Sequence, residues 1–173
     1  DMVIAGGCDT VQTPFGYLCF ATAGALSPRG KSRTFDASGD GIAISEGLAA
    51  VVLKRRADAE RDGDRIYAVI RAAAGGSDGR SMGMTAPRVE GQVRTLARAY
   101  EQARFPSSSV ELFEAHGTGT ARGDRTECLS LTAMLERDGA PLQNSAIGSV
   151  KSNIGHTKCT AGVAGLMKAA LAL

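Results

Sequence analysis

The sequence GSVKSNIGHTKCTAGVAG, residues 148–165, carries the clearest indication of how this chain folds. It places Lys151 and His156 directly before residues 161–173, a run in which one lysine is the only charged residue. A helix that is apolar on every side is typical of a helix buried in a large core, and these thirteen residues are too few to cross a bilayer. We therefore expect a lysine and a histidine to be held rigidly against a buried helix.

The composition is that of an ordinary globular domain. The chain has 173 residues, of which 43% are hydrophobic and 22% are charged, enough for one core. A net charge of +2 and the absence of tryptophan argue against a nucleic-acid binder. The four cysteines form no CxxC pair, which favours reduced thiols in a cytoplasmic protein without a membrane segment. Both ends lie inside apolar segments, so we expect an internal piece of a longer protein.

Short apolar runs bounded by glycine or charge predict five β-strands. They cover residues 2–5 (closed by Gly6 and Gly7), 46–53, 66–74, 110–115 and 145–150. Helices are expected at residues 15–23, 54–64, 88–104, from 124 onward, and at 161–173. The helix at 88–104 has the clearest pattern, because its apolar residues from Val89 to Tyr100 recur every three or four positions. The alternation predicts an α/β protein with helices on both sides of a sheet.

Several of these elements carry finer expectations. The strand at 46–53 has the length and the flanks of a strand that is covered on both faces, and the charged block at 54–64 predicts an exposed short helix. Pro87 ends a loop at 77–87 and is expected in the first turn of the next helix. The helix that starts at Asp124 is expected to turn three apolar residues inward: Cys128, Leu131 and Leu135.

The two histidines of the chain occupy matching positions. His116 follows a predicted strand in EAHGTGT, and His156 follows a predicted strand and turn in KSNIGH, with Lys151 nearby. Ligand sites in open α/β sheets form at the carboxyl ends of strands. A cluster of these donors can hold a carbonyl oxygen while negative charge grows on it, and the lysine would lower the imidazole pKa values.

Each of these residues also has a structural interpretation. A histidine in a loop is often a hydrogen-bonding turn residue, and Lys151 could be an ion-pair partner of Asp124 or Glu127. Thr118 and Thr120 either satisfy backbone groups in their turn or present both hydroxyls on one side to a ligand amide.

Other hypotheses assign chemistry elsewhere. One is a metal site built from His116, Cys128, His156 and Cys159, of which only the last two have acceptable ligand spacing. Another makes Cys159 a nucleophile, since the amide end of a helix lowers the pKa of a thiol. A phosphate loop is excluded because no glycine precedes the lysine of Lys-Ser. The basic loop at 29–33 is either solvated or docks an acidic partner.

Two motifs resemble a known family. EAHGTGTARGD (residues 114–124) and GSVKSNIGHTKCTAGVAGLMKAALAL (148–173) closely resemble the two C-terminal signatures of β-ketoacyl synthases, the condensing domains of polyketide and fatty-acid synthases. The segments AGG (5–7), LSPRGKSRTFDASGDG (26–41) and EGLAAVVLKR (46–55) are similar to those that precede the signatures. The resemblance covers essentially the whole chain, in the family's order.

The resemblance implies a fold and a reaction. The fold is thiolase-type, a layered αβαβα arrangement, with residues 1–63 as the end of the N-terminal half and 64–173 as most of the C-terminal half. The reaction is a decarboxylative Claisen condensation, in which the carbanion of a malonyl thioester attacks an acyl group held on a cysteine. The substrates are carried on the phosphopantetheine of an acyl carrier protein, no further cofactor is bound, and the full domain is a homodimer.

Roles for individual residues also come from the resemblance. His116 and His156 match the family histidines that hold the malonyl thioester carbonyl and assist decarboxylation, and Lys151 matches the lysine that supports one of them. Thr118 and Thr120 match the threonines that contact the pantetheine arm. Asp124 and Glu127 are assigned a supporting role beside them.

The sequence departs from the family pattern in several places. None of the four cysteines matches the family nucleophile, which is expected upstream, and the family's gating loop is missing, so the chain alone is expected to be inactive. Ser45-Glu46-Gly47 replaces the usual Gly-Glu-Gly. The segments GDRTE and GHTKCTAG are more similar to iterative synthases of the enediyne-polyene or polyunsaturated-fatty-acid kind than to modular synthases. The alternative is an inactive, chain-length-factor-like partner that binds a carrier protein or dimerises. A synthase acting on coenzyme A thioesters is disfavoured by the HGTGT motif.

Overall fold

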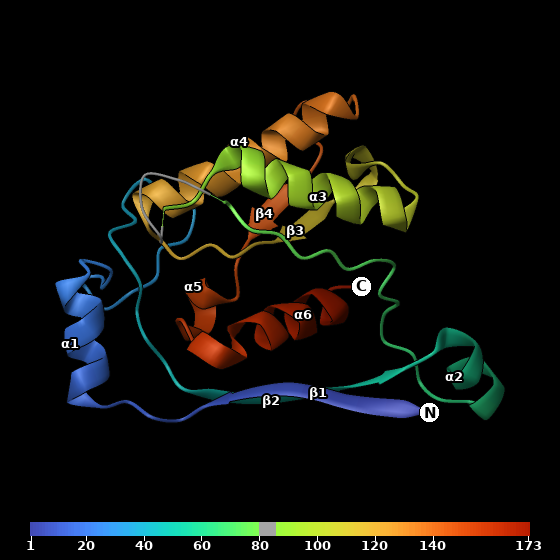
Figure 1. Ribbon diagram of the computed structural model, residues 1–173, viewed down its shortest axis with the longest axis horizontal. Coiled ribbons are helices and arrows are strands. Elements are labelled where there is room, and N and C mark those ends of the chain that lie inside the picture. The colour runs from blue at the N-terminus through green and yellow to red at the C-terminus, as the bar shows by residue number, and fades with distance from the viewer. Residues whose placement is uncertain (80–85) are drawn as a thin grey trace.

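The computed structural model describes residues 1–79 and 86–173, which form alternating strands and helices (Figure 1). The strands are β1 (Met2–Asp9), β2 (Gly47–Lys54), β3 (Leu112–Glu114) and β4 (Ala146–Gly148). The helices are α1 (Pro14–Thr22), α2 (Arg56–Asp62), α3 (Val89–Ala103), α4 (Ala121–Arg137), α5 (Lys151–Ile154) and α6 (Ala161–Leu171), with short 3₁₀ turns η1 (Ser107–Ser109) and η2 (Lys158–Thr160).

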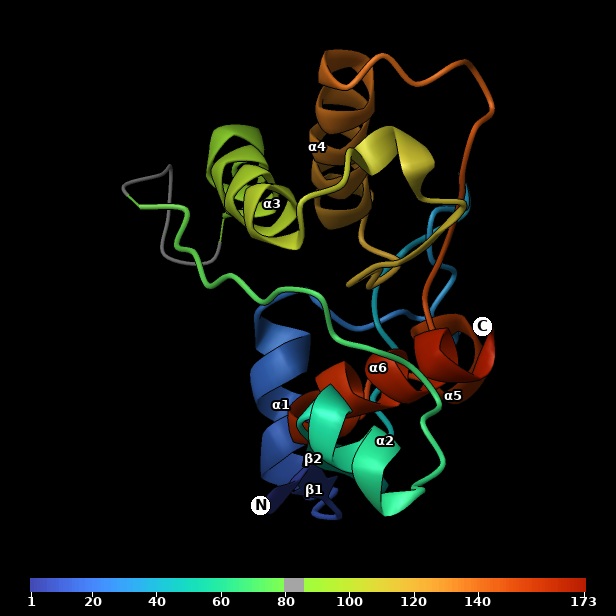
Figure 2. The ribbon, with the colours of Figure 1, turned by 90° about the vertical axis from the view of Figure 1, so that its right-hand side faces the viewer.

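The elements are stacked in layers. β1 and β2 pair antiparallel over their whole length, from Met2 opposite Lys54 to Asp9 opposite Gly47. β3 and β4 pair in parallel. Helix α6 lies between these two sheets, and α3 and α4 lie side by side on the far side of β3 and β4 (Figures 1 and 2). The prediction of an α/β fold with helices on both sides of a sheet is therefore confirmed.

β1 is longer than the sequence predicts. Gly6 and Gly7 do not close the strand but continue it, because they allow other backbone segments to approach closely. A Cβ on Gly6 would lie 2.6 Å from the carbonyl oxygen of Ala49 in β2, and one on Gly7 would lie 2.4 Å from the carbonyl oxygen of Cys159 in η2. The two glycines therefore hold β1 against β2 and against the turn that precedes α6.

The expected burial of β2 and α6 is wrong. Leu48 and Val52 of β2 are 75% and 65% exposed, because α6 and η2 cover only one face of the β1–β2 sheet in the part of the chain that the structure describes. Helix α6 buries fully only Ala161 and Gly165, since small residues face the sheets it separates, while Leu171 remains 72% exposed.

Residues 66–74 do not form the expected strand. They follow α2 without regular secondary structure (Figure 2). Tyr67 and Ile70 are 58% and 55% exposed. Within the described ranges this segment pairs with no strand, so its apolar pattern has no partner to complete a sheet. The expected loop at 77–87 falls partly outside the described residues. Pro87 lies before Arg88, the N-cap of α3, and not in its first turn.

Helix α4 begins at Ala121, three residues before the expected start, and its inner face is more polar than expected. Its buried residues are Asp124, Thr126, Ser130 and Met134, whereas Cys128, Leu131 and Leu135 are only half-buried. The physical reason is that α4 packs against a loop whose backbone N–H groups require acceptors, so a carboxylate faces inward. The predicted helices at 15–23, 54–64 and 88–104 are confirmed as α1, α2 and α3 within a few residues.

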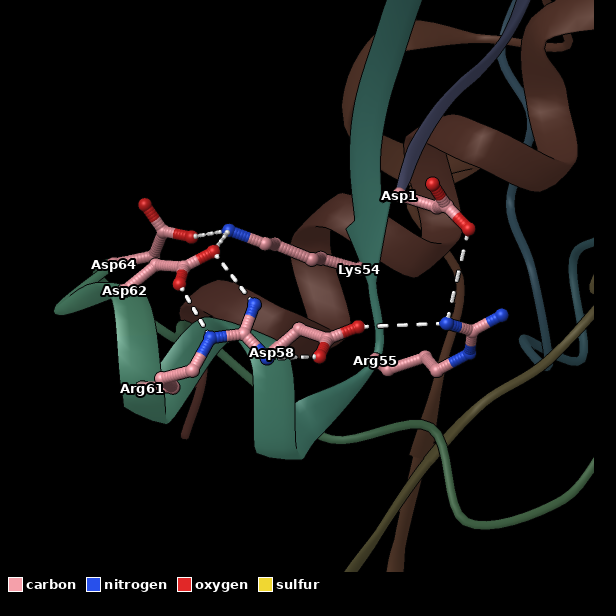
Figure 3. Close-up of polar contacts among 7 residues, drawn as sticks. All are labelled: Asp1, Lys54, Arg55, Asp58, Arg61, Asp62 and Asp64. Carbon is pink, nitrogen blue, oxygen red and sulfur yellow. Dashed lines mark hydrogen bonds and ion pairs between the residues drawn. The ribbon is translucent and has the colours of Figure 1, made fainter.

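The charged block that contains α2 forms a network of ion pairs on the surface (Figure 3). Lys54, at the end of β2, contacts Asp62 at 2.6 Å and also contacts Asp64. Arg61 contacts Asp58 at 2.7 Å and Asp62 at 2.9 Å. The network ties the end of β2 to the segment that leaves α2. In the described residues, no helix has both the length and the apolar character needed to cross a membrane.

Candidate functional site

The parallel pair β3–β4 brings the predicted donors to one edge. His116 follows β3 by two residues, Lys151 opens α5 three residues after the end of β4, and His156 follows α5. Since the carboxyl ends of parallel strands meet at the same edge, these segments converge. The ring centroids of His116 and His156 lie 5.6 Å apart with an interplanar angle of 84°. Both imidazoles can therefore reach one small ligand group.

The backbone fixes His156 on both sides. Its N–H donates to the carbonyl of Ala43 at 2.7 Å, and its carbonyl accepts from Ser45 N–H at 3.1 Å. Gly155 precedes it with a φ of 77°, and a Cβ there would lie 2.8 Å from the carbonyl oxygen of Ala43. Glycine is therefore required where the chain passes this loop.

The protonation of the His156 ring is set by a backbone amide. The N–H of Lys158 donates to Nδ1 of His156 at 3.0 Å. Lys158 itself has a φ of 48°, a left-handed conformation that is uncommon for a residue other than glycine. Because Nδ1 accepts a hydrogen bond, the neutral imidazole carries its proton on Nε2. His156 can thus donate a hydrogen bond from Nε2.

Two carboxylates of α4 hold the loop that carries His116. Glu127 accepts from the N–H groups of His116 and Gly117, both at 2.7 Å. Asp124 accepts from Thr118 N–H at 3.0 Å, from Gly119 N–H at 3.1 Å and, on its other oxygen, from Phe35 N–H at 2.7 Å. Both carboxylates therefore act on the backbone of the loop.

This arrangement corrects the expected pairing of Lys151. Lys151 is only 4% exposed, and among the described residues no carboxylate oxygen lies within ion-pair distance of its Nζ. Asp124 and Glu127 instead accept the backbone N–H groups of the loop. Burial lowers the pKa of Lys151, and the charges of Glu127, Glu114 and Asp124 oppose that shift from a distance.

Both histidines have a lowered pKa. Removal of water lowers the pKa of His116, and the charge of Lys151 adds to the effect. The pKa of His156 is lowered to about 4, first by burial and then by the charge of Lys151 and by the neighbouring His116. The sequence prediction that the cluster lowers the imidazole pKa values is confirmed, so both rings are neutral near pH 7.

The two threonines of the loop lie together. The hydroxyls of Thr118 and Thr120 are 2.9 Å apart, so they share one side of the loop as the spacing predicts. Two cavities flank the site. One, of about 410 Å³, lies beside His116 between β3, α3 and α4. The other, of about 720 Å³, lies beside Lys151 under the loop that contains Lys31.

The other sequence hypotheses gain no support from the geometry. Within the described part of the chain, no three side chains of His, Cys, Asp or Glu are placed to hold a metal ion. Cys159 is exposed, and it helps to lower the pKa of Asp9 in β1, which is lowered first by Lys158. In the basic loop, Arg29 pairs with Asp40 at 2.7 Å and Arg33 donates to Ser38 at 2.9 Å, which favours a loop held by its own contacts.

The sequence analysis did not predict that the side chains of Asp124 and Glu127 in α4 accept hydrogen bonds from backbone N–H groups of the loop. The signal was present in the spacing, because Asp124 and Glu127 are three positions apart and share one face of a helix. The role of the Lys158 N–H had no signal, since every residue type except proline carries that group.

Comparison with known proteins identifies the family. The family model described as Beta-ketoacyl synthase, N-terminal domain, matches residues 1–59, and the model of the C-terminal domain matches residues 67–173. One polypeptide of the phenolphthiocerol/phthiocerol polyketide synthase of Mycobacterium tuberculosis is 46% identical over 173 residues, all of this chain and 8% of that protein. Polyketide synthase PksN of Bacillus subtilis is 43% identical over 180 aligned residues, 100% of this chain and 3% of that protein.

Solved structures agree with the family models. The ketosynthase from module 6 of the bacillaene synthase of Bacillus subtilis 168 superposes with a TM-score of 0.96 and 42% identity, covering 99% of this chain and 31% of that one. The PfaC keto synthase–chain length factor gives a TM-score of 0.93 and 37% identity, with 99% and 18% covered. The thiolase-type α/β fold that the sequence predicts is thereby confirmed. The chain, which spans less than a tenth of these curated relatives, belongs to the β-ketoacyl synthase family and is similar to the ketosynthase domains of polyketide synthases.

Proposed function

We propose that this chain carries the malonyl-binding and decarboxylating part of a ketosynthase site. His116 and His156 donate hydrogen bonds to the thioester carbonyl of a malonyl group and stabilise the enolate that forms when CO₂ leaves. The carbanion then attacks an acyl thioester on a cysteine that lies outside residues 1–173, which forms a carbon–carbon bond, breaks the carbon–sulfur bond and releases the cysteine as its thiolate. The observation that carries the proposal is the 5.6 Å separation of two neutral imidazoles, one with its proton fixed on Nε2.

Neutral donors suit this step. The enolate oxygen gains negative charge as the carbon–carbon bond breaks, so donors that are already in place stabilise the transition state more than the ground state. A lowered imidazole pKa keeps each ring neutral, so that each presents one N–H, and in His156 the unprotonated Nδ1 stays free to accept from Lys158 N–H. The buried ammonium of Lys151 adds positive potential close to both rings.

The substrate is proposed to arrive on a carrier protein. Thr118 and Thr120 present two adjacent hydroxyls on the His116 loop, which suits the amides of a phosphopantetheine arm. Asp124 and Glu127 position that loop through its backbone. We propose an acyl carrier protein as partner and a homodimer as the working state, in the cytoplasm, with no cofactor beyond the carrier's phosphopantetheine.

The test uses the full polypeptide that carries this sequence. His116→Ala and His156→Ala should each lower malonyl decarboxylation by about 10²–10³-fold, the usual cost of removing one donor to a developing oxyanion. Leu142→Ala, at a position 97% exposed on the surface, is the matched control and should decarboxylate at the wild-type rate. Wild-type decarboxylation by both histidine variants would remove the assignment.

The alternative is an inactive partner of the chain-length-factor type, favoured only by the likeness to a chain that contains such a factor. A histidine variant would then leave decarboxylation by the assembled synthase unchanged, and the position of the nucleophile would hold a residue other than cysteine. A parent of the iterative enediyne-polyene or polyunsaturated-fatty-acid kind stays a prediction that rests on GDRTE and GHTKCTAG.

A further inference from the structure

Glu114 is a largely buried carboxylate that the proposed chemistry does not use. It is the last residue of β3, two positions before His116, and its side chain is 9% exposed. One oxygen, Oε1, accepts from the N–H of Val150 at 2.6 Å, and the other, Oε2, accepts from Nζ of Lys168 at 2.6 Å. A single carboxylate thus joins β3, the start of α5 and α6.

The connections of Glu114 lead directly to the donors. Along β3 the chain passes from Glu114 to His116, and Val150 is the residue immediately before Lys151. Both bonds involve an ionised group at short distance, the class of hydrogen bond that is strongest and most directional. A displacement of this carboxylate would therefore shift the backbone on both sides of the site.

Helix α6 is shaped to receive the carboxylate. Gly165 faces it, and a Cβ at that position would lie 3.3 Å from Cγ of Glu114. Lys168 follows on the same face of α6, one turn later, with a side chain that is 35% exposed. The helix thus offers a gap for the carboxylate and a cation for its outer oxygen.

We propose that Glu114 and Lys168 are a positioning pair, which holds His116 and Lys151 in register by fastening β3 and the start of α5 to α6. The proposal rests on the proposed function, since it assigns the pair a task in placing those donors. Neither side chain touches the substrate. Removing either partner, or both, removes the contact that ties β3 to α6, so the two side chains are expected to act as one unit.

The experiment is a double-mutant cycle in the full polypeptide. Glu114→Gln and Lys168→Met should each lower kcat for malonyl decarboxylation by about tenfold to a hundredfold with little change in KM, since donors moved by a fraction of an ångström stabilise the transition state less. Glu114→Gln combined with Lys168→Met should be about as slow as either single variant, because all three lack the same contact between β3 and α6 and the two side chains act as one unit.

Controls separate this proposal from a general loss of stability. Arg56→Met removes the Arg56–Glu60 pair of α2, which has a similar length of 2.7 Å but lies far along the chain, and should leave kcat unchanged. The Lys168 side chain is 35% exposed, so Lys168→Met is expected to leave the domain folded. Wild-type kcat in Lys168→Met would overturn the proposal. So would a folded double variant whose loss of kcat equals the two single losses multiplied together, because the two side chains would then act independently.

The histidine variants measured in parallel keep the two proposals apart. If His116→Ala is slow while Lys168→Met is normal, only the positioning pair fails. If His116→Ala and His156→Ala both decarboxylate malonyl at the wild-type rate, the proposed function fails, and the positioning pair then has no donors to position.

Discussion

Two groups of acidic side chains in this chain make different kinds of contact. Around α2, Asp58 and Asp62 accept from the ends of long lysine and arginine side chains on the surface (Figure 3). On α4, Asp124 and Glu127 accept from backbone N–H groups. A flexible cation can change its partner without moving the chain, but a carboxylate bonded to the backbone fixes the chain itself. The geometry at the candidate site therefore depends on carboxylates that accept backbone N–H groups.

The first prediction concerns the three hydrogen bonds that Asp124 accepts from backbone N–H groups. Asp124→Ala leaves three N–H groups, those of Phe35, Thr118 and Gly119, without their acceptor. Each unsatisfied group costs about 1–3 kcal/mol, so the free energy of unfolding of the ketosynthase domain should fall by about 3 kcal/mol or more. Chemical denaturation measures it. Asp124→Asn keeps an acceptor oxygen and should lose less. Equal stability of Asp124→Ala and wild type would refute the comparison.

The second prediction concerns Asp138, which combines both kinds of contact. Arg137, and then the N–H and hydroxyl of Ser107, lower the pKa of Asp138 to about 2. Since the folded pKa lies below the unfolded value of 3.8, the carboxylate stabilises the fold above about pH 4, and this is lost as the pH falls towards 2.

Denaturation of Asp138→Asn across pH tests this sign. The variant should be less stable than wild type by about 1–2 kcal/mol at pH 6, and the gap should close between about pH 4 and pH 2. A gap that stays constant with pH would show that the charge of Asp138 is not the source of its effect.

The third prediction concerns the surface network and is the smallest. Lys54→Met removes the cation shared by Asp62 and Asp64 and should lower the melting temperature less than Asp138→Asn does. The effect should vanish in 1 M salt, where the Debye length is about 3 Å. A loss of stability as large as that of Asp124→Ala, or one that salt does not reduce, would contradict the distinction between the acidic residues around α2 and those of α4.

The sequence predicted most of the elements but not their surroundings. The helix at 88–104 and the strand–helix alternation follow from residue spacing, which the chain carries locally. Residues 66–74 have the composition of a strand, yet pairing requires a neighbour, which a local pattern does not report. The exposed face of β2 was missed for the same reason, because coverage depends on which element packs against it.

The proximity of the candidate residues was predicted from the long motifs that contain them. His116, His156 and Lys151 come from motifs whose position at strand ends brings them together. The expected ion pair of Lys151 with Asp124 or Glu127 was wrong. Opposite charges in the sequence suggest a pair, but both carboxylates accept from backbone N–H groups, and residue types do not show which N–H groups need an acceptor.

The left-handed turn at Lys158 has a consequence for genetics. The tautomer of His156 is selected by a main-chain amide, so every amino acid except proline at position 158 inherits the same N–H. Deep mutational scanning at position 158 would report the effects of side-chain charge and backbone conformation, but it would not detect the hydrogen bond that sets the tautomer of His156. Only a chemical edit of the polymer, an ester in place of the amide, can remove the bond and leave every side chain intact.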